Sequence, residues 1–230
     1  MISKGIDVSV YQGNIDYKRT GLDFAILRAG YGKTATQRDK LFDTHYDGFK
    51  SAGIPVGAYW FSYAKTVDEA KLEAQACIEV IKNKQFEYPI YYDVERQDQY
   101  NLGKQAVSAI IGAFCTELEA AGYWVGIYTN ASWYNSVLED DLKTRYALWI
   151  AHWDVSKPGI SGPYGLWQYK VGKQAGVTGD CDLDYGYVDY PQLIKAAGKN
   201  GFVATEPTKP KTIDVTITID GTTYSGTLTG

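Results

Sequence analysis

The chain has 230 residues, a length that suits one large domain or one domain with a small appendage. Hydrophobic residues make up 45% of it and charged residues 22%, and the formal net charge is −4. Proteins that bind nucleic acid usually carry a basic surface, so this charge argues against that class. No apolar run is long enough to span a membrane, and we expect neither nucleic acid nor membrane as a partner.

Cysteine and histidine are too few and too dispersed for a disulfide framework or a metal centre. Cys77, Cys115 and Cys181 form no close pair, and the histidines are His45 and His152. Cys77 and Cys115 fall on the apolar sides of expected helices, which is typical of core packing. We therefore expect no metal and no cofactor.

Short apolar or aromatic runs alternate with amphipathic stretches along the first two thirds of the chain. Each run is rich in β-branched or aromatic residues and is bounded by turn residues, as strands are. The runs show little strict alternation, which is typical of strands covered on both faces in a parallel sheet. The expected strands are residues 5–8, 24–29, 54–61, 88–94 and 124–128.

Helical periodicity fills the gaps between these strands. Aromatic residues recur at helical spacing over residues 42–49, and Thr66 and Glu69 form a capping-box pattern before the next apolar stripe. A longer stripe runs over residues 107–121. We expect one further short helix over residues 132–142.

The pattern changes in the last third of the chain. Residues 146–151, 166–169 and 182–185 are expected to be strands with no helix of any length between them. Repeated βα units followed by consecutive strands predict an α/β fold, an irregular TIM-like barrel. The functional site of such a barrel lies at the C-terminal ends of its strands.

Four acids fall where this barrel would carry its chemistry: Asp7 ends the first strand, Asp93 and Glu95 end the fourth, and Asp182 begins the last. Strand residues two apart point to the same side, roughly 6–7 Å apart, so Asp93 and Glu95 should project into one pocket. Two crowded carboxylates cannot both ionise easily, so one pKa should rise. A protonated acid beside an ionised one suits cleavage of a glycosidic bond. An isolated pair of this spacing is also common at solvated strand ends.

The chain is rich in aromatic residues, with 20 Tyr and 6 Trp, and several lie near the expected strand ends. Flat rings fill cores and also stack on sugar faces, so we expect some to be core residues and the others to bind a sugar. Arg28 is a further candidate for substrate binding, and it is expected either to pair with the acids or to hold a strand end. The candidate binding aromatics are Tyr59, Trp60, Tyr63, Tyr128, Trp153, Trp167 and Tyr169.

Several segments, taken in order, are similar to those of one known family. They begin with Lys4-Gly-Ile-Asp-Val-Ser-Val-Tyr-Gln-Gly-Asn-Ile-Asp, Phe24-Ala-Ile-Leu-Arg-Ala-Gly-Tyr-Gly and Gly53-Ile-Pro-Val-Gly-Ala-Tyr-Trp-Phe-Ser-Tyr. Tyr91-Tyr-Asp-Val-Glu, Leu148-Trp-Ile-Ala, Trp167-Gln-Tyr and Gly179-Asp-Cys-Asp-Leu-Asp follow. Together they cover about residues 4–190 and resemble glycoside hydrolase family 25, the Chalaropsis-type lysozymes.

The resemblance implies a (β/α)5(β)3 barrel, five βα units closed by three further strands. It implies a 1,4-β-N-acetylmuramidase, an enzyme that hydrolyses the β-1,4 bond between N-acetylmuramic acid and N-acetylglucosamine in bacterial peptidoglycan. By position, Glu95 resembles the general acid/base, Asp93 its partner, and Asp7 and Asp182 the remaining pocket acids. The expected course is retention, with either the substrate's acetamido oxygen or Asp93 attacking the anomeric carbon.

Two segments depart from the family pattern. Many members carry Lys-x-Ser/Thr-Glu-Gly where this chain has Arg28-Ala-Gly-Tyr-Gly. The last motif usually reads Asp-Leu-Asn, whereas here it is Asp182-Leu-Asp184.

Other functions fit parts of the pattern. A chitinase-like barrel would have further acids before Asp93, where Tyr91 and Tyr92 stand. A non-catalytic peptidoglycan- or chitin-binding barrel would not need all four acids. A metal-dependent phosphodiesterase could use the four acids to hold Mg²⁺ or Ca²⁺.

Residues after 203 differ in composition from the barrel. Residues 204–211 are rich in Pro, Lys and Thr and are expected to be a linker. Residues 212–230 alternate apolar and polar side chains around Asp220-Gly221, a strong hairpin turn signal. We expect a catalytic barrel over 1–203 and a β-hairpin tail over 212–230. Because a lone hairpin is marginal in water, it should dock on the barrel, bind the wall or mediate self-association.

The protein is expected to act on the bacterial cell wall. The opening Met1-Ile-Ser-Lys lacks the apolar segment of a secretory signal. We therefore expect phage-type release or a secreted protein whose signal has been removed.

Overall fold

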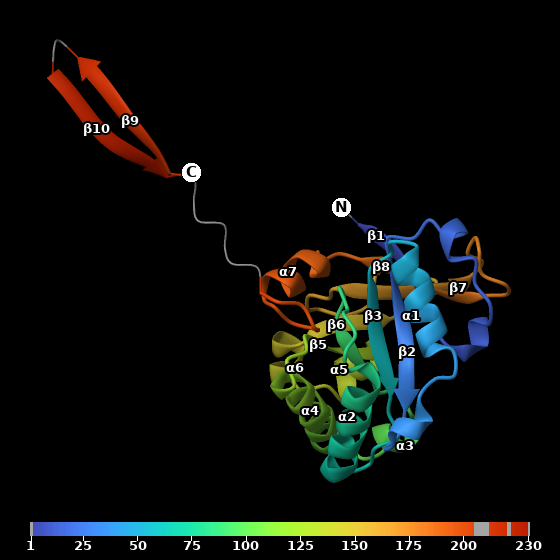
Figure 1. Ribbon diagram of the computed structural model, residues 1–230. Helices are drawn as coiled ribbons and strands as arrows, with labels where there is room; N and C mark the ends of the chain where they lie inside the picture. The colour runs from blue at the N-terminus through green and yellow to red at the C-terminus, as the bar shows by residue number, and fades with distance from the viewer. Residues whose placement is uncertain (1, 205–211, 220–221, 230) are drawn as a thin grey trace.

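Eight strands close into one barrel in the computed structural model, which describes residues 2–204, 212–219 and 222–229. Neighbouring strands in the barrel are neighbours in sequence, and β8 closes it against β1 (Figure 1). The strands are β1 Ser3–Val8, β2 Phe24–Tyr31, β3 Val56–Phe61, β4 Ile90–Asp93, β5 Val125–Asn130, β6 Ala147–Ala151, β7 Leu166–Gly172 and β8 Cys181–Gly186.

Strand direction divides the barrel into a regular and an irregular part. Strands β1 to β7 pair in parallel, whereas β8 runs antiparallel to both β7 and β1. Helical segments follow each of β1 to β5, and none separates β6, β7 and β8. The expected (β/α)5(β)3 barrel is therefore confirmed.

Helices cover the outside of the regular part (Figure 1). Short 3-10 turns stand in the first connection, where an α-helix would be usual. The α-helices are α1 Phe42–Ser51, α2 Val67–Ile81, α3 Gln97–Tyr100, α4 Lys104–Ala120, α5 Ala131–Ser136, α6 Asp140–Arg145 and α7 Tyr190–Ala196.

The local signals that place α2 and α4 are those read from the sequence. The Thr66 side chain accepts a hydrogen bond of 3.2 Å from the backbone nitrogen of Glu69 and so caps α2. Gly122, just beyond the end of α4, has a positive φ of 90°, a conformation that glycine adopts without steric cost. Both helices bury their apolar faces against each other and the barrel.

The single helix expected over residues 132–142 is wrong, because two short helices, α5 and α6, occupy this region. The Ser108 hydroxyl on α4 donates to the carbonyl of Val137 and accepts from the backbone nitrogen of Glu139. These bonds hold the chain in a non-helical conformation between α5 and α6. Helix α7, which was not expected, starts with an Asp189 cap and Pro191 in its first turn.

Strand residues alternate between the barrel interior and the layer beneath the helices. Phe24, Tyr91 and Trp149 belong to the interior cluster, whereas Ala25 and Tyr92, each one residue further along, belong to the layer under the helices. The interior is thus filled by large rings rather than open. This two-residue alternation decides which side chains can reach the site at the end of the barrel.

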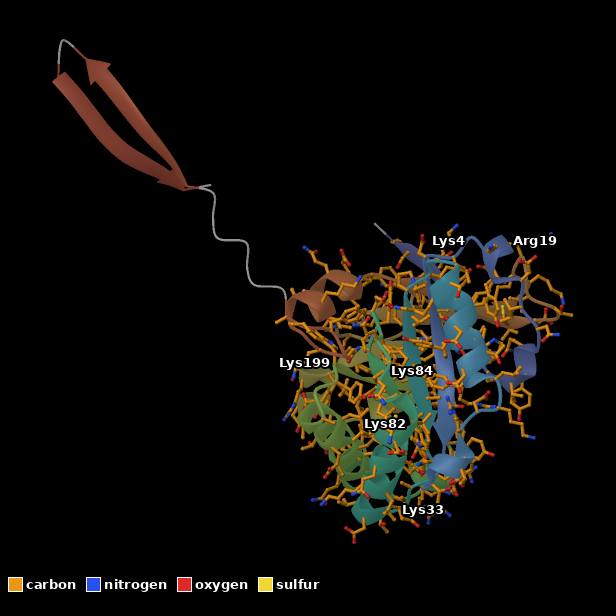
Figure 2. All side chains as sticks on the ribbon, viewed as in Figure 1. Lys4, Arg19, Lys33, Lys82, Lys84 and Lys199 are labelled. Atoms are coloured by element: carbon orange, nitrogen blue, oxygen red, sulfur yellow. The ribbon has the colours of Figure 1, made fainter. Side chains whose placement is uncertain are left out.

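The described residues contain no membrane-spanning helix, and several surface lysines pair with acids. Within residues 2–204, 212–219 and 222–229, no helix has the length and apolarity to cross a membrane. Lys33, Lys82 and Lys84 lie at separate points on the barrel surface, and each pairs with an acid (Figure 2). All three cysteines are buried and free, as expected for Cys77 and Cys115.

The C-terminal residues form the expected pair of strands, β9 Thr212–Ile219 and β10 Thr222–Thr229. They pair antiparallel from Thr222 opposite Ile219 to Thr229 opposite Thr212. The expected linker beyond residue 204 and the turn at Asp220-Gly221 lie outside the described residues.

Candidate active site

The four candidate acids lie around one cavity of about 290 Å³ at the C-terminal end of the parallel strands. Asp7, Asp93, Glu95 and Asp182 all line it. These residues come from β1, from β4 and the loop after it, and from β8, so barrel closure brings together positions up to 175 residues apart. The other residues that line the cavity are Ser9, Tyr11, Gln12, Arg28, Tyr59, Phe61, Tyr128, Trp149, Trp153 and Gln168.

Asp7 and Asp182 face each other across the antiparallel pair of β1 and β8. Directly opposed residues in such a pair have Cβ atoms roughly 4.5–5.5 Å apart, so their charges repel. Burial, followed by the charges of Asp184 and Asp182, raises the pKa of Asp7 well above its ordinary value. Burial likewise raises the pKa of Asp182.

Asp93 and Glu95 are positioned by the buried residue between them. The Val94 backbone nitrogen donates to the carbonyl of Tyr128 at 3.2 Å, and its carbonyl accepts from the Thr129 hydroxyl at 3.0 Å. These bonds fix Val94 against β5, with its side chain in the layer under the helices. The two acids on either side of it therefore turn into the cavity.

The two acids differ in their surroundings. Asp93 is 5% exposed, and its buried Oδ1 has no hydrogen-bond partner in the described structure. Burial and the charge of Glu95 raise its pKa well above the ordinary value, although the positive charge of Arg28 opposes this. Glu95 is more exposed, and partial burial and the charge of Asp182 raise its pKa. The cavity thus favours bound protons on both carboxyls.

Gln168 on β7 orients Asp7. Its Oε1 accepts from the Tyr128 hydroxyl and from the Trp153 Nε1, both at 3.0 Å. Because both donors face the oxygen, the amide nitrogen must point the other way, and it donates to Asp7 Oδ2 at 2.8 Å. One amide therefore links the cleft surface to a buried acid.

Arg28 does not pair directly with the four acids. Its guanidinium bonds to Asp39 at 2.7 Å, and the Asp39 carboxylate also accepts from the backbone nitrogens of Val10 and Leu41. The Arg28 guanidinium also lies 5.0 Å from the ring centre of Tyr11. Arg28 is therefore held in the wall of the cavity, from where its charge acts on Asp93 at longer range.

The structure brings some of the candidate aromatic residues to the cavity and excludes others. Tyr59, Tyr128 and Trp153 line it, and Trp153 is 49% exposed. Tyr63 is 43% exposed and lines an adjoining depression of about 610 Å³ that shares Arg28 and Tyr11 with the cavity.

Trp60, Trp167 and Tyr169 belong to the expected binding set but lie away from the acid cavity. Trp60 is fully buried on the outer face of β3, where its Nε1 donates to the carbonyl of Gly32. Because Gln168 points into the cavity, its neighbours Trp167 and Tyr169 point to the opposite face of β7, where both pack on Tyr185. These three rings do not line the acid cavity.

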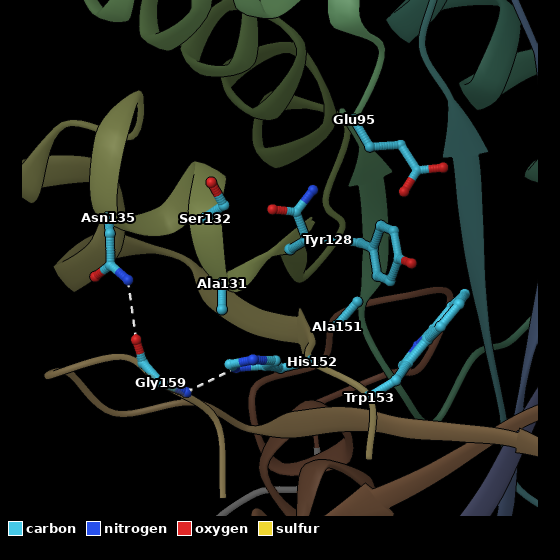
Figure 3. A pocket seen from close by; sticks show the side chains of 10 residues that line it. Glu95, Tyr128, Ala131, Ser132, Asn135, Ala151, His152, Trp153 and Gly159 are labelled. Carbon is cyan, nitrogen blue, oxygen red and sulfur yellow. Dashed lines mark hydrogen bonds between the residues drawn. The ribbon is translucent and has the colours of Figure 1, made fainter. Parts of the chain in front are cut away.

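A second depression, of about 560 Å³, extends the cavity beyond Glu95 (Figure 3). Glu95, Tyr128 and Trp153 border both depressions. Asn135 and His152 form its far wall and are fixed by hydrogen bonds to Gly159 at 2.9 and 3.0 Å. The acids thus sit partway along an extended cleft with aromatic and amide side chains in its walls.

Sequence reasoning missed Gln168, Trp149 and Tyr11 as residues of the cavity. Gln168 could have been found from its place between Trp167 and Tyr169, because an inward-facing polar residue in an apolar strand needs a buried partner. Tyr11 gave no such signal, since it follows β1 in a 3-10 turn. Within the described residues, no group of three or more His, Cys, Asp or Glu side chains could hold a metal ion.

A barrel that places crowded carboxyls in a cleft lined by rings has the type of site that glycoside hydrolases use. The sequence pattern of glycosyl hydrolases family 25 matches residues 6–177. The chain belongs to this family.

Named relatives agree with the family. The chain is 32% identical over 187 residues to the autolytic lysozyme of Clostridium acetobutylicum and 30% identical over 198 residues to lysozyme M1 of Streptomyces globisporus. These matches cover 79% and 78% of this chain. The crystal structure of the bacterial lysozyme from Streptomyces coelicolor superposes with a TM-score of 0.70 at 27% identity, over 85% of this chain and 96% of that one.

The chain spans only part of the curated relatives. It matches 55% of the length of the Clostridium protein and 66% of the length of the Streptomyces globisporus protein.

Proposed function

We propose that the protein is a lysozyme that hydrolyses the β-1,4 bond between N-acetylmuramic acid and N-acetylglucosamine in bacterial peptidoglycan. The observation that carries this proposal is the cavity in which Glu95, Asp93, Asp7 and Asp182 meet within an extended cleft. A glycan strand needs such a cleft, because sugars lie on both sides of the bond that is cleaved. The names of the relatives support the same substrate.

Glu95 is the general acid in this proposal, and Asp93 stabilises the positive charge that develops on the sugar. In the free protein, burial raises the pKa of Asp93 more strongly than that of Glu95, which is more exposed. A sugar bound over Glu95 removes water from its carboxyl and raises its pKa further. The developing positive charge at the anomeric carbon stabilises the anion of Asp93, so substrate binding favours the proton on Glu95.

The reaction then proceeds in two steps with retention. The glycosidic bond breaks as Glu95 gives its proton to the leaving O4 of N-acetylglucosamine, and the acetamido oxygen of N-acetylmuramic acid bonds to its own C1. Water next attacks C1 and gives a proton to Glu95, which restores the acid and opens the ring intermediate. The first product is the β-anomer.

The first experiment uses Glu95→Gln with Glu79→Gln, an exposed residue on α2, as the matched control. Loss of a general acid lowers rates by about 10²–10⁴-fold. We expect Glu95→Gln to abolish the release of reducing ends from purified peptidoglycan and leave the far-UV circular dichroism unchanged, while Glu79→Gln stays active. Near-normal release by Glu95→Gln would remove the residue from this role, and no release by the wild-type chain would overturn the function.

The acetamido route is separated from direct attack by Asp93 with a thiazoline analogue of the ring intermediate. The analogue should inhibit competitively, because the cavity is proposed to bind that ring. A covalent glycosyl adduct on Asp93, found by mass spectrometry of rapidly denatured enzyme, would instead establish Asp93 as the nucleophile. The non-catalytic peptidoglycan- or chitin-binding barrel predicts binding without any released reducing end.

We propose the bacterial cell wall as the site of action, since the chain is 32% identical over 187 residues to the autolytic lysozyme of Clostridium acetobutylicum. The proposed division of the chain is a catalytic barrel over 1–203, a linker over 204–211 and a hairpin over 212–230. A two-stranded sheet has two edges that can pair with another chain, which supports self-association through β9 and β10. Deletion of residues 209–230 should lower the solution mass to that of a monomer, and an unchanged mass would contradict self-association.

A further inference from the structure

A fifth carboxyl, that of Asp184, lies inside the barrel beneath the cavity. It is 1% exposed and does not line the cavity. Its Oδ1 accepts a hydrogen bond of 2.8 Å from the Trp149 Nε1. Its Oδ2 is buried and has no hydrogen-bond donor in the described structure. An ionised carboxylate with such an oxygen would carry a large desolvation cost.

The strand register places Asp184 next to Asp7. Asp184 is opposite Gly5 and Asp182 is opposite Asp7, so Asp184 and Asp7 are diagonal neighbours on the inner face of the β1–β8 pair. Gly5 has no side chain to separate them. Diagonal neighbours on one face of a sheet lie close enough for their side chains to interact, and the charge of Asp184 raises the pKa of Asp7. Two carboxylates can only repel at this contact, whereas one proton between them makes a hydrogen bond.

The surroundings of the two carboxyls favour Asp184 as the one that keeps the proton. Asp7 Oδ2 accepts a hydrogen bond from the amide of Gln168, which is oriented by Tyr128 and Trp153, and this bond stabilises an ionised Asp7. Asp7 also borders the cavity, where its charge can be solvated. Asp184 is the more deeply buried of the two carboxyls, so a negative charge is less favourable on Asp184 than on Asp7.

We propose that Asp184 is a positioning residue that stays protonated in the folded protein and donates its Oδ2 proton to Asp7. A protonated carboxyl offers one donor and one acceptor, as an amide does, and here it bonds to Asp7 and Trp149 at once. Asp7 is then held between Gln168 and Asp184, and it alone of the pair carries negative charge toward the cavity.

The groups around Asp184 agree with a neutral carboxyl. Burial and the charge of Asp182 raise its pKa well above the ordinary value, and the hydrogen bond from Trp149 opposes this only in part. No positive charge of the described residues acts directly on it. The other titratable neighbours are Tyr91 on β4, Tyr169 on β7 and Cys181 on β8, and burial raises the pKa of each, so they are neutral too.

The test compares Asp184→Asn, Asp184→Ala and the control Asp180→Asn, an exposed acid that pairs with Lys173 in the same segment. The raised pKa of Asp184 means that its stabilising protonation is complete below the unfolded pKa of about 3.9 and is lost as pH rises. Asp184→Asn has no such loss. The melting temperature of the variant minus that of wild type should therefore be larger at pH 8 than at pH 4, by about 3 °C or more.

Two further readouts separate a proton-holding residue from a purely structural one. At pH 7 the infrared difference spectrum of wild type minus Asp184→Asn should contain the carbonyl band of a protonated acid. The spectrum of wild type minus the control Asp180→Asn should lack that band. Asp184→Ala removes the bonds to Trp149 and Asp7 and should lower kcat/KM by roughly 10–100-fold, whereas Asp184→Asn should recover most of it.

A missing protonated-acid band, or a melting difference that does not grow with pH, would overturn the inference. These two readouts need no substrate. Only the kcat/KM comparison rests on the proposed function, so a failure of that function would leave the infrared and melting results to decide the state of Asp184.

Discussion

The Nε1 of Trp153 donates a hydrogen bond of 3.0 Å to the Oε1 of Gln168, so a ring exposed in the cleft is tied to a buried amide. The same amide holds Asp7 through its nitrogen. A sugar that stacks on the indole would therefore meet a ring whose orientation is coupled to the acid cavity. Cleft shape and acid position are thus set by one side chain of β7.

Replacement of Gln168 with Leu should reduce both stability and activity. The Tyr128 hydroxyl and Asp7 Oδ2 would lose their partner in the barrel interior, and each buried unpaired group costs about 1–3 kcal/mol. We expect the free energy of unfolding, measured by urea denaturation, to fall by roughly 2 kcal/mol or more. Gln192→Leu on the exposed face of α7 is the control, and equal losses in both variants would contradict the role of the Gln168 network.

The pH dependence of activity should reveal that substrate raises the pKa of Glu95. The alkaline limb of kcat/KM reports the free enzyme, and that of kcat reports the complex. Because bound sugar removes water from Glu95, the limb of kcat should lie at higher pH than that of kcat/KM. Initial rates between pH 4 and pH 9 measure both limbs, and a kcat limb at the same or lower pH would count against Glu95 as the acid.

Asp182→Asn should move the alkaline limb of kcat/KM in a known direction. The negative charge of Asp182 raises the pKa of Glu95, so its removal lets Glu95 lose its proton at lower pH. The alkaline limb of kcat/KM should therefore move to lower pH in Asp182→Asn, and it should stay in place in Asp180→Asn. An alkaline shift in Asp182→Asn would show that the two carboxyls do not interact as described.

Asp93→Asn should lose activity and gain stability at neutral pH. Loss of one electrostatic stabiliser lowers kcat by about 10²–10³-fold. The folded pKa of Asp93 is raised, so the unfolded chain loses its proton first, and wild-type stability falls as pH rises from about 4 through the folded value. The variant lacks this fall, and its melting temperature should exceed that of wild type more at pH 8 than at pH 4. A difference independent of pH would contradict the buried, high-pKa state of Asp93.

The barrel could be predicted because its strands are short apolar runs, each between turn residues. Asp93 and Glu95 could be predicted as a pair because they directly follow such a run. The end of the helix that begins at Ala131 could not be predicted from the sequence. The helix ends there because Ser108, a residue of α4 some 30 positions earlier, forms hydrogen bonds with Val137 and Glu139. The spacing of residues within the segment does not reveal that contact.

The sequence could not show which of the candidate aromatic residues would reach the acid cavity. Strands buried on both faces lack polar alternation, so nothing in Tyr59-Trp60-Phe61 shows which ring faces the interior. The register of the strands decides which ring faces the interior: Trp60 lies under the helices, whereas Tyr59 lines the cavity. Register across β1, β7 and β8 likewise gives Asp7 its bond to Gln168 and its diagonal neighbour Asp184, which lie more than 160 positions away in the chain.

Gly126 on β5 provides a test of how tightly the interior is filled. A Cβ added there would overlap the ring of Tyr91 and lie 2.9 Å from the carbonyl oxygen of Ala147. Tyr91 is fully buried against Trp149, so it cannot move aside without disturbing the ring layer beneath the acids. Gly126→Ala should therefore lower the free energy of unfolding by roughly 1–3 kcal/mol.

The matched control is Gly112→Ala in the middle of α4, where the nearest atom to the added Cβ is 3.8 Å away. A helix interior gains roughly 0.5–1 kcal/mol when glycine becomes alanine, so this variant should be as stable as wild type or more so. If the barrel interior is as closely packed as described, urea denaturation should show a lower free energy of unfolding for Gly126→Ala and an unchanged or higher one for Gly112→Ala. If Gly126→Ala were neutral, the ring of Tyr91 would have room to shift, and the fixed floor of the acid cavity would lose its support.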